Sequence, residues 1–239
     1  MKKAMCLLLA SVLWQAAPAQ VVIALLFGDK LNTNQLEFGI VVTPVWTNIS
    51  NFDGQRRDGL DLGIYFNIHP EKRFFLHIEG IAKGVLGARG MKPYPLGNDT
   101  LDALFASGLV ERKIKAFSLP VLGRYAITPK LFAEAGIQPN MMLKARDIFR
   151  SKVNGDQLEY TVNSSDEVTL LDFGVDAGLF YKFSKDKRSM GIGLRYFQGL
   201  TDMQKTFGTQ LNSAWQLNIT IPIGAGKVNS NMNNKNPAD

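Results

Sequence analysis

Two side chains with acid–base chemistry stand two positions apart, at His77 and Glu79. Alternate residues of a β-strand point to the same face, so this imidazole and carboxylate would lie side by side in a strand. Such a pair can act as a general acid and a general base. The chain has only 2 histidines, and neither forms a nucleophile motif with a serine. We therefore interpret the pair as polar packing within the fold.

Asp172 and Asp176 would also share a face of a strand. Four strand positions separate them by ~13 Å, which is too far for two carboxylates to share a proton or a metal ion unaided. Residues 53–54 and 154–156 have the chemistry of turns and lack the other ligands of a calcium loop. The sequence therefore predicts no catalytic residue, no cofactor-binding residue and no metal ligand.

The elements that position these side chains follow from the segment Leu171–Phe183. Every second residue in it is apolar, and the residues between them are mostly glycine, aspartate and lysine. A period of two indicates a β-strand, because alternate side chains point to opposite faces. The 13 residues of this segment exceed the ~5–6 residues of a usual strand. Strands that cross a membrane are long and alternate in this way.

The same alternation recurs along the chain and predicts eight strands. The fourth contains Pro120, which predicts a bulge because proline cannot donate to a strand ladder. The predicted ranges are 36–48, 59–69, 73–85, 113–127, 131–143, 171–183, 189–200 and 211–224. The connections after the first, third, fifth and seventh strands are long and polar, whereas the others are short turns. Bacterial outer-membrane barrels show this asymmetry between their two ends.

These patterns predict an all-β fold, an eight-stranded antiparallel transmembrane up-and-down β-barrel in the outer membrane. A sheet in lipid must close, since every backbone amide needs an internal partner. The apolar faces would contact lipid, and the opposite faces would form a polar network in the lumen. We expect that network to contain Asp61, His77, Glu79, Lys83, Arg124, Glu134, Asp172, Asp176 and Arg195. The alternative fold is a soluble periplasmic β-sandwich.

The chain termini have a different character from the predicted barrel. Residues 1–19 have a basic start, an apolar stretch and an Ala-x-Ala site, which predicts a cleaved signal peptide. The only cysteine, Cys6, lies inside it. Loss of Lys2 and Lys3 with no acidic residue lowers the net charge from +6 to +4, and no basic run suggests nucleic-acid binding. We expect a periplasmic segment at 20–35, the barrel at 36–224 and a disordered polar tail at 225–239.

Four segments resemble one protein family. They are 25–32 with 36–39 at the start of the chain, 117–125 in the fourth predicted strand, and 171–183. Together they are similar to PorT-type outer-membrane β-barrel proteins of the Bacteroidota. The resemblance implies a signal peptide, an outer-membrane location and a small barrel. One branch of that family takes part in type IX protein secretion and gliding.

The sequence thus favours a non-catalytic structural or accessory protein of the outer membrane, linked through the resemblance to type IX secretion. Its partners would be outer-membrane lipid and other envelope or secretion-system proteins, bound through long loops at 86–112 and 144–167. One alternative is a small channel or transporter for solutes. Another is an outer-membrane lipid-modifying enzyme that uses His77 and Glu79.

Overall fold

The computed structural model describes residues 33, 35–51, 54–153, 155–186, 188–204 and 209–223. The predicted signal peptide and polar tail, and most of the predicted segment 20–35, lie outside these residues. The elements are β1 Leu36–Ile49, β2 Gln55–Ile68, β3 Phe74–Met91, α3 Asp99–Phe105, β4 Leu109–Ser118, β5 Val121–Ala126, β6 Leu131–Val153, β7 Asp156–Asn163, β8 Leu171–Lys182, β9 Gly191–Gly199 and β10 Asn212–Pro222. Within the described ranges, no helix has the length and apolar character needed to cross a membrane.

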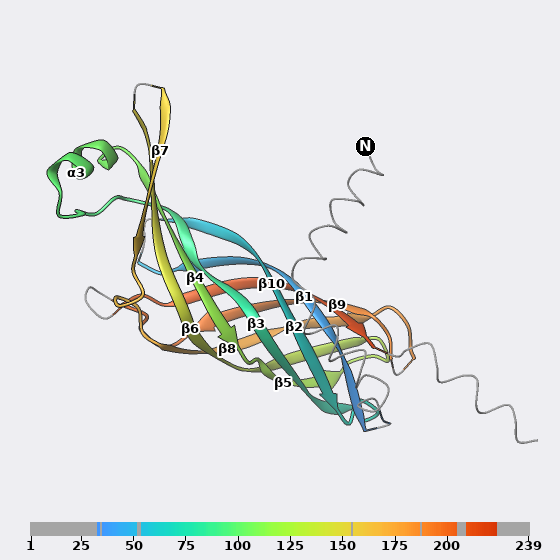
Figure 1. Cartoon of the computed structure of the whole chain (residues 1–239). Helices are drawn as coiled ribbons and strands as arrows, with labels where there is room; N and C mark the ends of the chain where they lie inside the picture. Colours follow the sequence, from blue (N-terminus) through green and yellow to red (C-terminus); the bar gives the residue numbers. More distant parts are fainter. Residues whose placement is uncertain are drawn as a thin grey trace, which may run out of the picture.

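The strands form one antiparallel sheet that closes into a barrel (Figure 1). Closure is seen at β1, which pairs with β2 on one side and with β10 on the other. β4 and β5 share one place in the ring, because both lie between β3 and β6. Leu119 and Pro120 separate them, as expected for a proline that cannot donate to the ladder. The predicted eight-stranded up-and-down barrel is confirmed.

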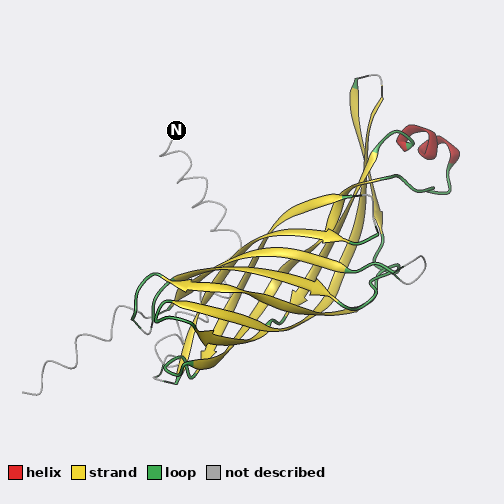
Figure 2. Ribbon diagram, turned by 180° about the vertical axis from the view of Figure 1, so that it is seen from behind, coloured by secondary structure: helices red, strands yellow, loops and turns green. Residues whose placement is uncertain are grey.

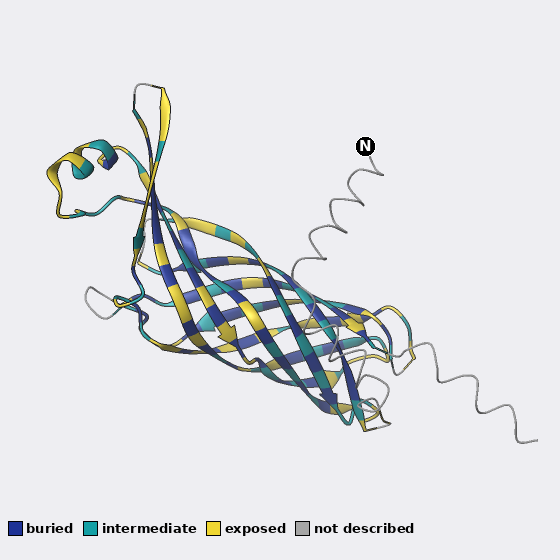
Figure 3. Cartoon of the chain, in the orientation of Figure 1, coloured by how far each residue is buried: buried dark blue, intermediate teal, exposed yellow. Residues whose placement is uncertain are grey.

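The barrel wall is apolar outside and polar inside. On β8, Leu171 and Leu179 are exposed on the outer face, whereas Asp172 and Asp176 are buried on the inner face. Buried residues alternate with half-buried or exposed ones along most of each strand of the ring (Figure 3). A soluble barrel would show the opposite arrangement, so this outer surface suits contact with lipid.

The two faces exchange character partway along β4. Phe117 is exposed on the outer wall, but the next outward residues toward the start of the strand, Lys115 and Lys113, carry charge. On the inner face, Ile114 and Val110 are buried. Charged residues outside and apolar residues inside are the arrangement expected where the protein surface contacts water rather than lipid. The lipid-facing band therefore ends between Phe117 and Lys115.

Beyond this level, one side of the barrel continues as a sheet that we call the extension, residues 84–116 and 142–163. The predicted loops at 86–112 and 144–167 are wrong in this respect. Strands occupy both ends of the first range, since β3 runs to Met91 and β4 begins at Leu109, and they occupy most of the second, where β6 turns back as β7. Asn98 caps α3 by accepting from the backbone N–H groups of Thr100 and Leu101. The β6–β7 hairpin and α3 project beyond the ring (Figure 2).

Apolar side chains close both ends of the lumen. Phe75, Phe132 and Phe180 cluster at the end with the short turns. A larger cluster fills the opposite end and extends into the extension. It contains Ile49, Leu86, Ala88, Met91, Phe105, Val110, Ile114, Ala116, Met142, Ala145, Phe149, Val168 and Met203. The polar lumen therefore lies between two apolar plugs.

Candidate functional site

The centre of the lumen holds a network of arginine and glutamate side chains from four strands. The Arg195 Nη2 donates to Glu79 Oε1 at 2.7 Å, and the Arg124 Nε donates to Glu134 Oε2 at 2.7 Å. Arg195 Nε also lies 3.7 Å from Glu134 Oε1, which joins the two pairs. The guanidinium of Arg124 stacks over the ring of Phe180, 3.8 Å from its centroid. The network thus ties β3, β5, β6 and β9 together.

His77 and Glu79 belong to this network. Their side chains lie 2.8 Å apart, Nε2 to Oε1, and the other ring nitrogen of His77 faces the amide oxygen of Asn67. Both side chains are 0 % exposed, as are those of Arg124 and Arg195. A substrate cannot reach an acid–base pair that is fully enclosed by protein. The arrangement gives these residues the role of a packed, ion-paired core.

The remaining predicted lumen acids take separate positions. Asp61 accepts from the backbone N–H of Val85 at 2.8 Å. Asp172 accepts from the amides of Asn140 and Asn212 at 3.2 and 2.8 Å. Asp176 is buried on the same inner face as Asp172. Among the described residues, no group of three or more His, Cys, Asp or Glu side chains could hold a metal ion.

Lys83 does not belong to the lumen network, which corrects its predicted position. The pairing of β3 with β4 shifts register between Ile81 and Gly84. This irregularity inserts one extra residue into β3, so that both Ala82 and Lys83 are exposed on the outer wall. Strict alternation cannot anticipate such a bulge.

A further buried ion pair lies where the barrel meets the extension. Arg112 Nε and Nη2 donate to the two carboxylate oxygens of Asp147 at 2.8 and 2.6 Å. The hydroxyl of Tyr94, from the β3–β4 connection, donates to the same carboxylate at 2.7 Å. Gln204, from the β9–β10 connection, accepts from Arg112 at 3.0 Å. The pair therefore fastens two connections to the strands.

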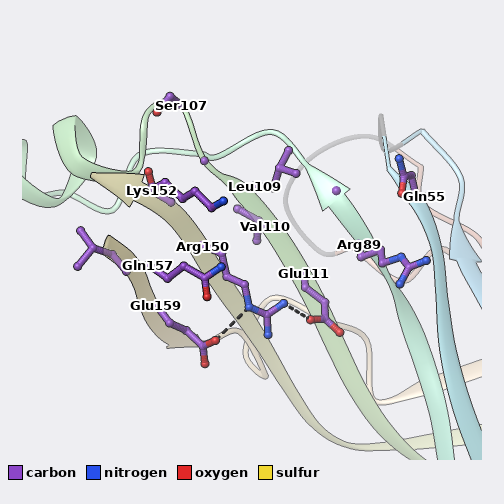
Figure 4. Close-up of a pocket in the computed structure, with 14 residues that line it drawn as sticks. Gln55, Arg89, Ser107, Leu109, Val110, Glu111, Arg150, Lys152, Gln157 and Glu159 are labelled. Atoms are coloured by element: carbon purple, nitrogen blue, oxygen red, sulfur yellow. Dashed lines mark hydrogen bonds and ion pairs between the residues drawn. The ribbon is translucent and has the colours of Figure 1, made fainter. Parts of the chain in front are cut away.

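The extension bears a pocket of about 720 Å³. It is lined by residues of β4, β6 and β7, together with Ser107, Gly108, the end of β3 and Gln55 at the start of β2 (Figure 4). Arg150 lies between Glu111 and Glu159, with Nη1 2.6 Å from Glu111 Oε2 and Nε 3.0 Å from Glu159 Oε2. Leu109 and Leu158 add apolar surface. Its volume falls in the range of ligand-binding pockets.

Glu111 is the hub of the charges in this pocket. Besides Arg150, it accepts from Arg57 Nε at 3.0 Å and lies 3.6 Å from Lys113 Nζ. Burial alone would raise the pKa of Glu111, but the hydrogen bonds from Arg150 and Arg57 hold that pKa below its usual value. The pocket thus presents fixed charges of both signs. Such a lining suits a polar peptide segment better than an apolar solute.

β7 adds a second feature to the extension. Within the described chain, β7 pairs with β6 alone, so its other edge presents unpaired backbone N–H and C=O groups. An open edge is a template for another strand, and extended peptides bind folded proteins by adding to such an edge. Pocket and edge lie on the same hairpin.

Several of these residues were missed by sequence reasoning. Arg112, Asp147 and Arg150 lie in or beside the ranges predicted as loops. The predicted strand 113–127 already contains the later part of β4, and the alternation could have been followed back to its start at Leu109, because Val110 and Arg112 are buried like Ile114 and Ala116. No local signal identifies Asp147 as the partner of Arg112, since the two are joined only by the pairing of β4 with β6.

Comparison with known proteins agrees with this architecture. The family model described as "Outer membrane protein beta-barrel domain" matches residues 34–205. No curated protein matches the chain significantly. Among solved structures, the attachment invasion locus protein Ail of Yersinia pestis is similar at 12 % identity, 78 % coverage of this chain, 97 % of Ail and a TM-score of 0.39.

Two further solved structures are similar at the same low level. Neisserial surface protein A matches with 9 % identity, 78 % coverage of this chain, 96 % of that protein and a TM-score of 0.40. The Pseudomonas putida toluene transporter TodX matches with 10 % identity, 84 % coverage of this chain, 72 % of TodX and a TM-score of 0.33.

Proposed function

The chain belongs to the family of outer membrane protein β-barrel domains. From this premise we propose that it is a non-catalytic accessory protein that binds another envelope protein at its extension. Its location is the outer membrane. Outer-membrane barrels have short periplasmic turns and longer external loops. The extension continues from the end with the long connections, so it would face outward from the membrane.

The observation that carries this proposal is the open edge of β7 beside the charged pocket. A chain segment added to β7 would gain backbone hydrogen bonds along Asp156–Asn163. Its side chains would meet Arg150, Glu159 and their neighbours in the pocket. Because the barrel already holds these strands in place, the surface would lose little conformational entropy when a partner binds.

The closed lumen supports binding over transport. An eight-stranded barrel has room inside for little more than side chains. Here arginine and glutamate pairs fill the centre, and Phe75, Phe132 and Phe180 close one end. The enclosure of His77 and Glu79 supports a non-catalytic role in the same way, because a lipid-modifying reaction needs access to its acid and base.

We extend the proposal to a link with type IX secretion and gliding. Its support is the resemblance of residues 25–32, 36–39, 117–125 and 171–183 to PorT-type barrels. The partner at β7 would then be a component of that secretion machinery.

The test is a mild-detergent isolation of the tagged mature protein from outer membranes, with identification of co-isolated proteins. A shortened hairpin, with residues 151–158 replaced by Asn-Gly, keeps the paired residues Arg150 and Glu159 joined by a two-residue turn. A matched control, Glu71→Gln with Lys72→Gln, alters the β2–β3 turn at the opposite end.

We expect the native protein and the control to co-isolate one partner in nearly equal amounts. The shortened hairpin should co-isolate at least tenfold less of that partner. Equal recovery by the shortened hairpin, or no partner with the native protein, would overturn the proposal. A partner outside the secretion machinery would retain the accessory role and remove the link to type IX secretion.

A further inference from the structure

A group of basic side chains covers the outer wall of β3, β4 and β6 just beyond the lipid-facing band. Lys83, Lys115, Lys144 and Arg146 are exposed, and Lys113 is half-buried. We call these five residues the basic patch. They project from the wall toward the surrounding membrane, whereas the pocket lies farther out along the extension.

Like charges face each other within the basic patch. Lys115 pairs in register with Lys144, and Lys113 pairs with Arg146. Side chains directly opposite on neighbouring strands have Cβ atoms about 5 Å apart, and like charges there are destabilising. Lys113 lies 3.6 Å from Glu111. Within the described chain, Lys83, Lys115, Lys144 and Arg146 form no ion pair, so the protein itself leaves their repulsion uncompensated.

The position of the basic patch adds a second, independent observation. One outward step below the Lys115–Lys144 pair, Phe117 pairs with Met141 on the lipid-facing wall. Both of these apolar side chains are exposed, and Leu143 beside them is 56 % exposed. The step along the strand is about 7 Å. Cations thus stand directly above apolar surface on the same two strands.

We propose that the basic patch binds the anionic headgroup of a membrane lipid, with an acyl chain of that lipid lying against Phe117, Met141 and Leu143. The spacing of opposite residues allows Lys115 and Lys144 to reach one phosphate group together. Arg146 can give a phosphate two parallel N–H donors. Basic residues near a membrane surface attract anionic lipid headgroups.

The apolar pair Phe117 and Met141 beneath the charges favours a lipid as the occupant. A soluble anion would use the basic residues alone, whereas a lipid uses both layers. The inference does not depend on the proposed partner at β7, because the basic patch and the hairpin edge share no residue.

The test counts lipids retained on the full mature protein by native mass spectrometry from mixed micelles. The probes are phosphatidylglycerol, a bisphosphorylated lipid A and zwitterionic phosphatidylcholine. The variant Lys115→Gln/Lys144→Gln/Arg146→Gln removes three charges from the basic patch. The control Lys72→Gln/Lys185→Gln/Arg188→Gln removes three charges at the short-turn end. Heat-modifiable gel mobility verifies that every variant is folded.

We expect the native protein and the control to retain both anionic lipids at least tenfold more than phosphatidylcholine, and the patch variant to lose this preference. High salt should weaken retention, because exposed charges are screened. Equal retention of anionic lipid by the patch variant would overturn the proposal, as would a native protein that shows no preference for it. Full displacement by soluble pyrophosphate at equal concentration would identify an anion site and overturn the assignment to lipid.

The apolar layer has its own variant. Phe117→Ser with Met141→Ser keeps all five basic residues and removes the proposed acyl contact. We expect anionic lipid retention to fall severalfold while pyrophosphate binding stays unchanged. Unchanged lipid retention would show that the charges act alone and would overturn the two-layer site.

Discussion

Arg112 and Asp147 face each other in register across β4 and β6, and two hydrogen bonds of 2.8 and 2.6 Å join their side chains. Both side chains are buried, and they lie among the residues of the larger apolar cluster rather than inside the polar lumen. Tyr94 and Gln204 bring two separate connections to the same pair. This relationship makes the extension continuous with the barrel, which a binding platform requires.

Replacement of Asp147 by Asn should destabilise the protein strongly. The change removes the carboxylate that binds both Nε and Nη2 of the buried Arg112, and it leaves only the partly exposed Glu167, 3.3 Å from Nη2, as a counter-charge. Loss of one member of a buried ion pair costs about 3–5 kcal/mol. Glu159→Gln is the matched control, because Glu159 pairs with Arg150 at the surface, where a pair contributes about 0–1 kcal/mol. Denaturant unfolding in detergent measures both. Equal losses would contradict the role given to Asp147.

Tyr94 should make the protein less stable at alkaline pH. Burial, followed by the neighbouring Asp147 carboxylate, raises the pKa of Tyr94 well above its ordinary value of 10.0. Because the folded-state pKa is the higher one, this contribution is complete below pH 10 and is lost as the pH rises further. Tyr94→Phe should therefore narrow the difference in unfolding free energy between pH 8 and pH 11. If Tyr94→Phe left the change in unfolding free energy between pH 8 and pH 11 unaltered, the contact of Tyr94 with Asp147 would not contribute to stability as predicted.

Gly87 should resist substitution, whereas Gly80 on the same strand should not. Gly87 has a φ of +124°, and a Cβ there would overlap the carbonyl oxygen of Arg112. Its own carbonyl accepts from the hydroxyl of Thr47 at 2.8 Å. A Cβ at Gly80 meets only Ile64 at 3.7 Å, an ordinary contact. Gly87→Ala should lower the unfolding free energy by about 1–3 kcal/mol, whereas Gly80→Ala should leave it nearly unchanged. Denaturant unfolding in detergent measures both variants, and equal losses would contradict this prediction.

The protein should show no steady conductance in a planar bilayer. The ion pairs of Arg195 with Glu79 and Glu134 fill the centre of the lumen. Apolar clusters lie at its two ends. Apolar constrictions exclude water and ions. A porin inserted in the same bilayer serves as the positive control. Uniform current steps from the purified native protein would contradict the closed lumen and favour the channel alternative.

The sequence predicts the ring of strands well because lipid imposes one rule along its whole length. Where the wall contacts lipid, outward residues are apolar and inward residues are polar, so alternation in β8 alone identifies both faces. The inner positions of Glu79, Arg124, Glu134 and Arg195 follow from that rule. Which arginine pairs with which glutamate does not follow, because it depends on contacts across the lumen.

The extension escaped prediction because that rule reverses outside the lipid. In β4, the outward residues Lys113 and Lys115 are charged and the inward residues Val110 and Ile114 are apolar. The predicted strand 113–127 therefore includes the later part of β4, whereas its first residues, 109–112, fall in a predicted loop. The bulge that turns Lys83 outward escaped for a related reason, since strict alternation holds only while the strand register is unbroken.

The most direct test of the account is site-specific photo-crosslinking in intact cells. A photoreactive residue at Gln157, which is exposed on β7 beside the pocket, should form a covalent adduct with one envelope protein. The same residue at Leu194, on the outer wall of β9, faces lipid and should form none. An adduct from Gln157 alone is the predicted result. The absence of a protein adduct from Gln157, or the same adduct from both positions, would contradict a partner-binding extension.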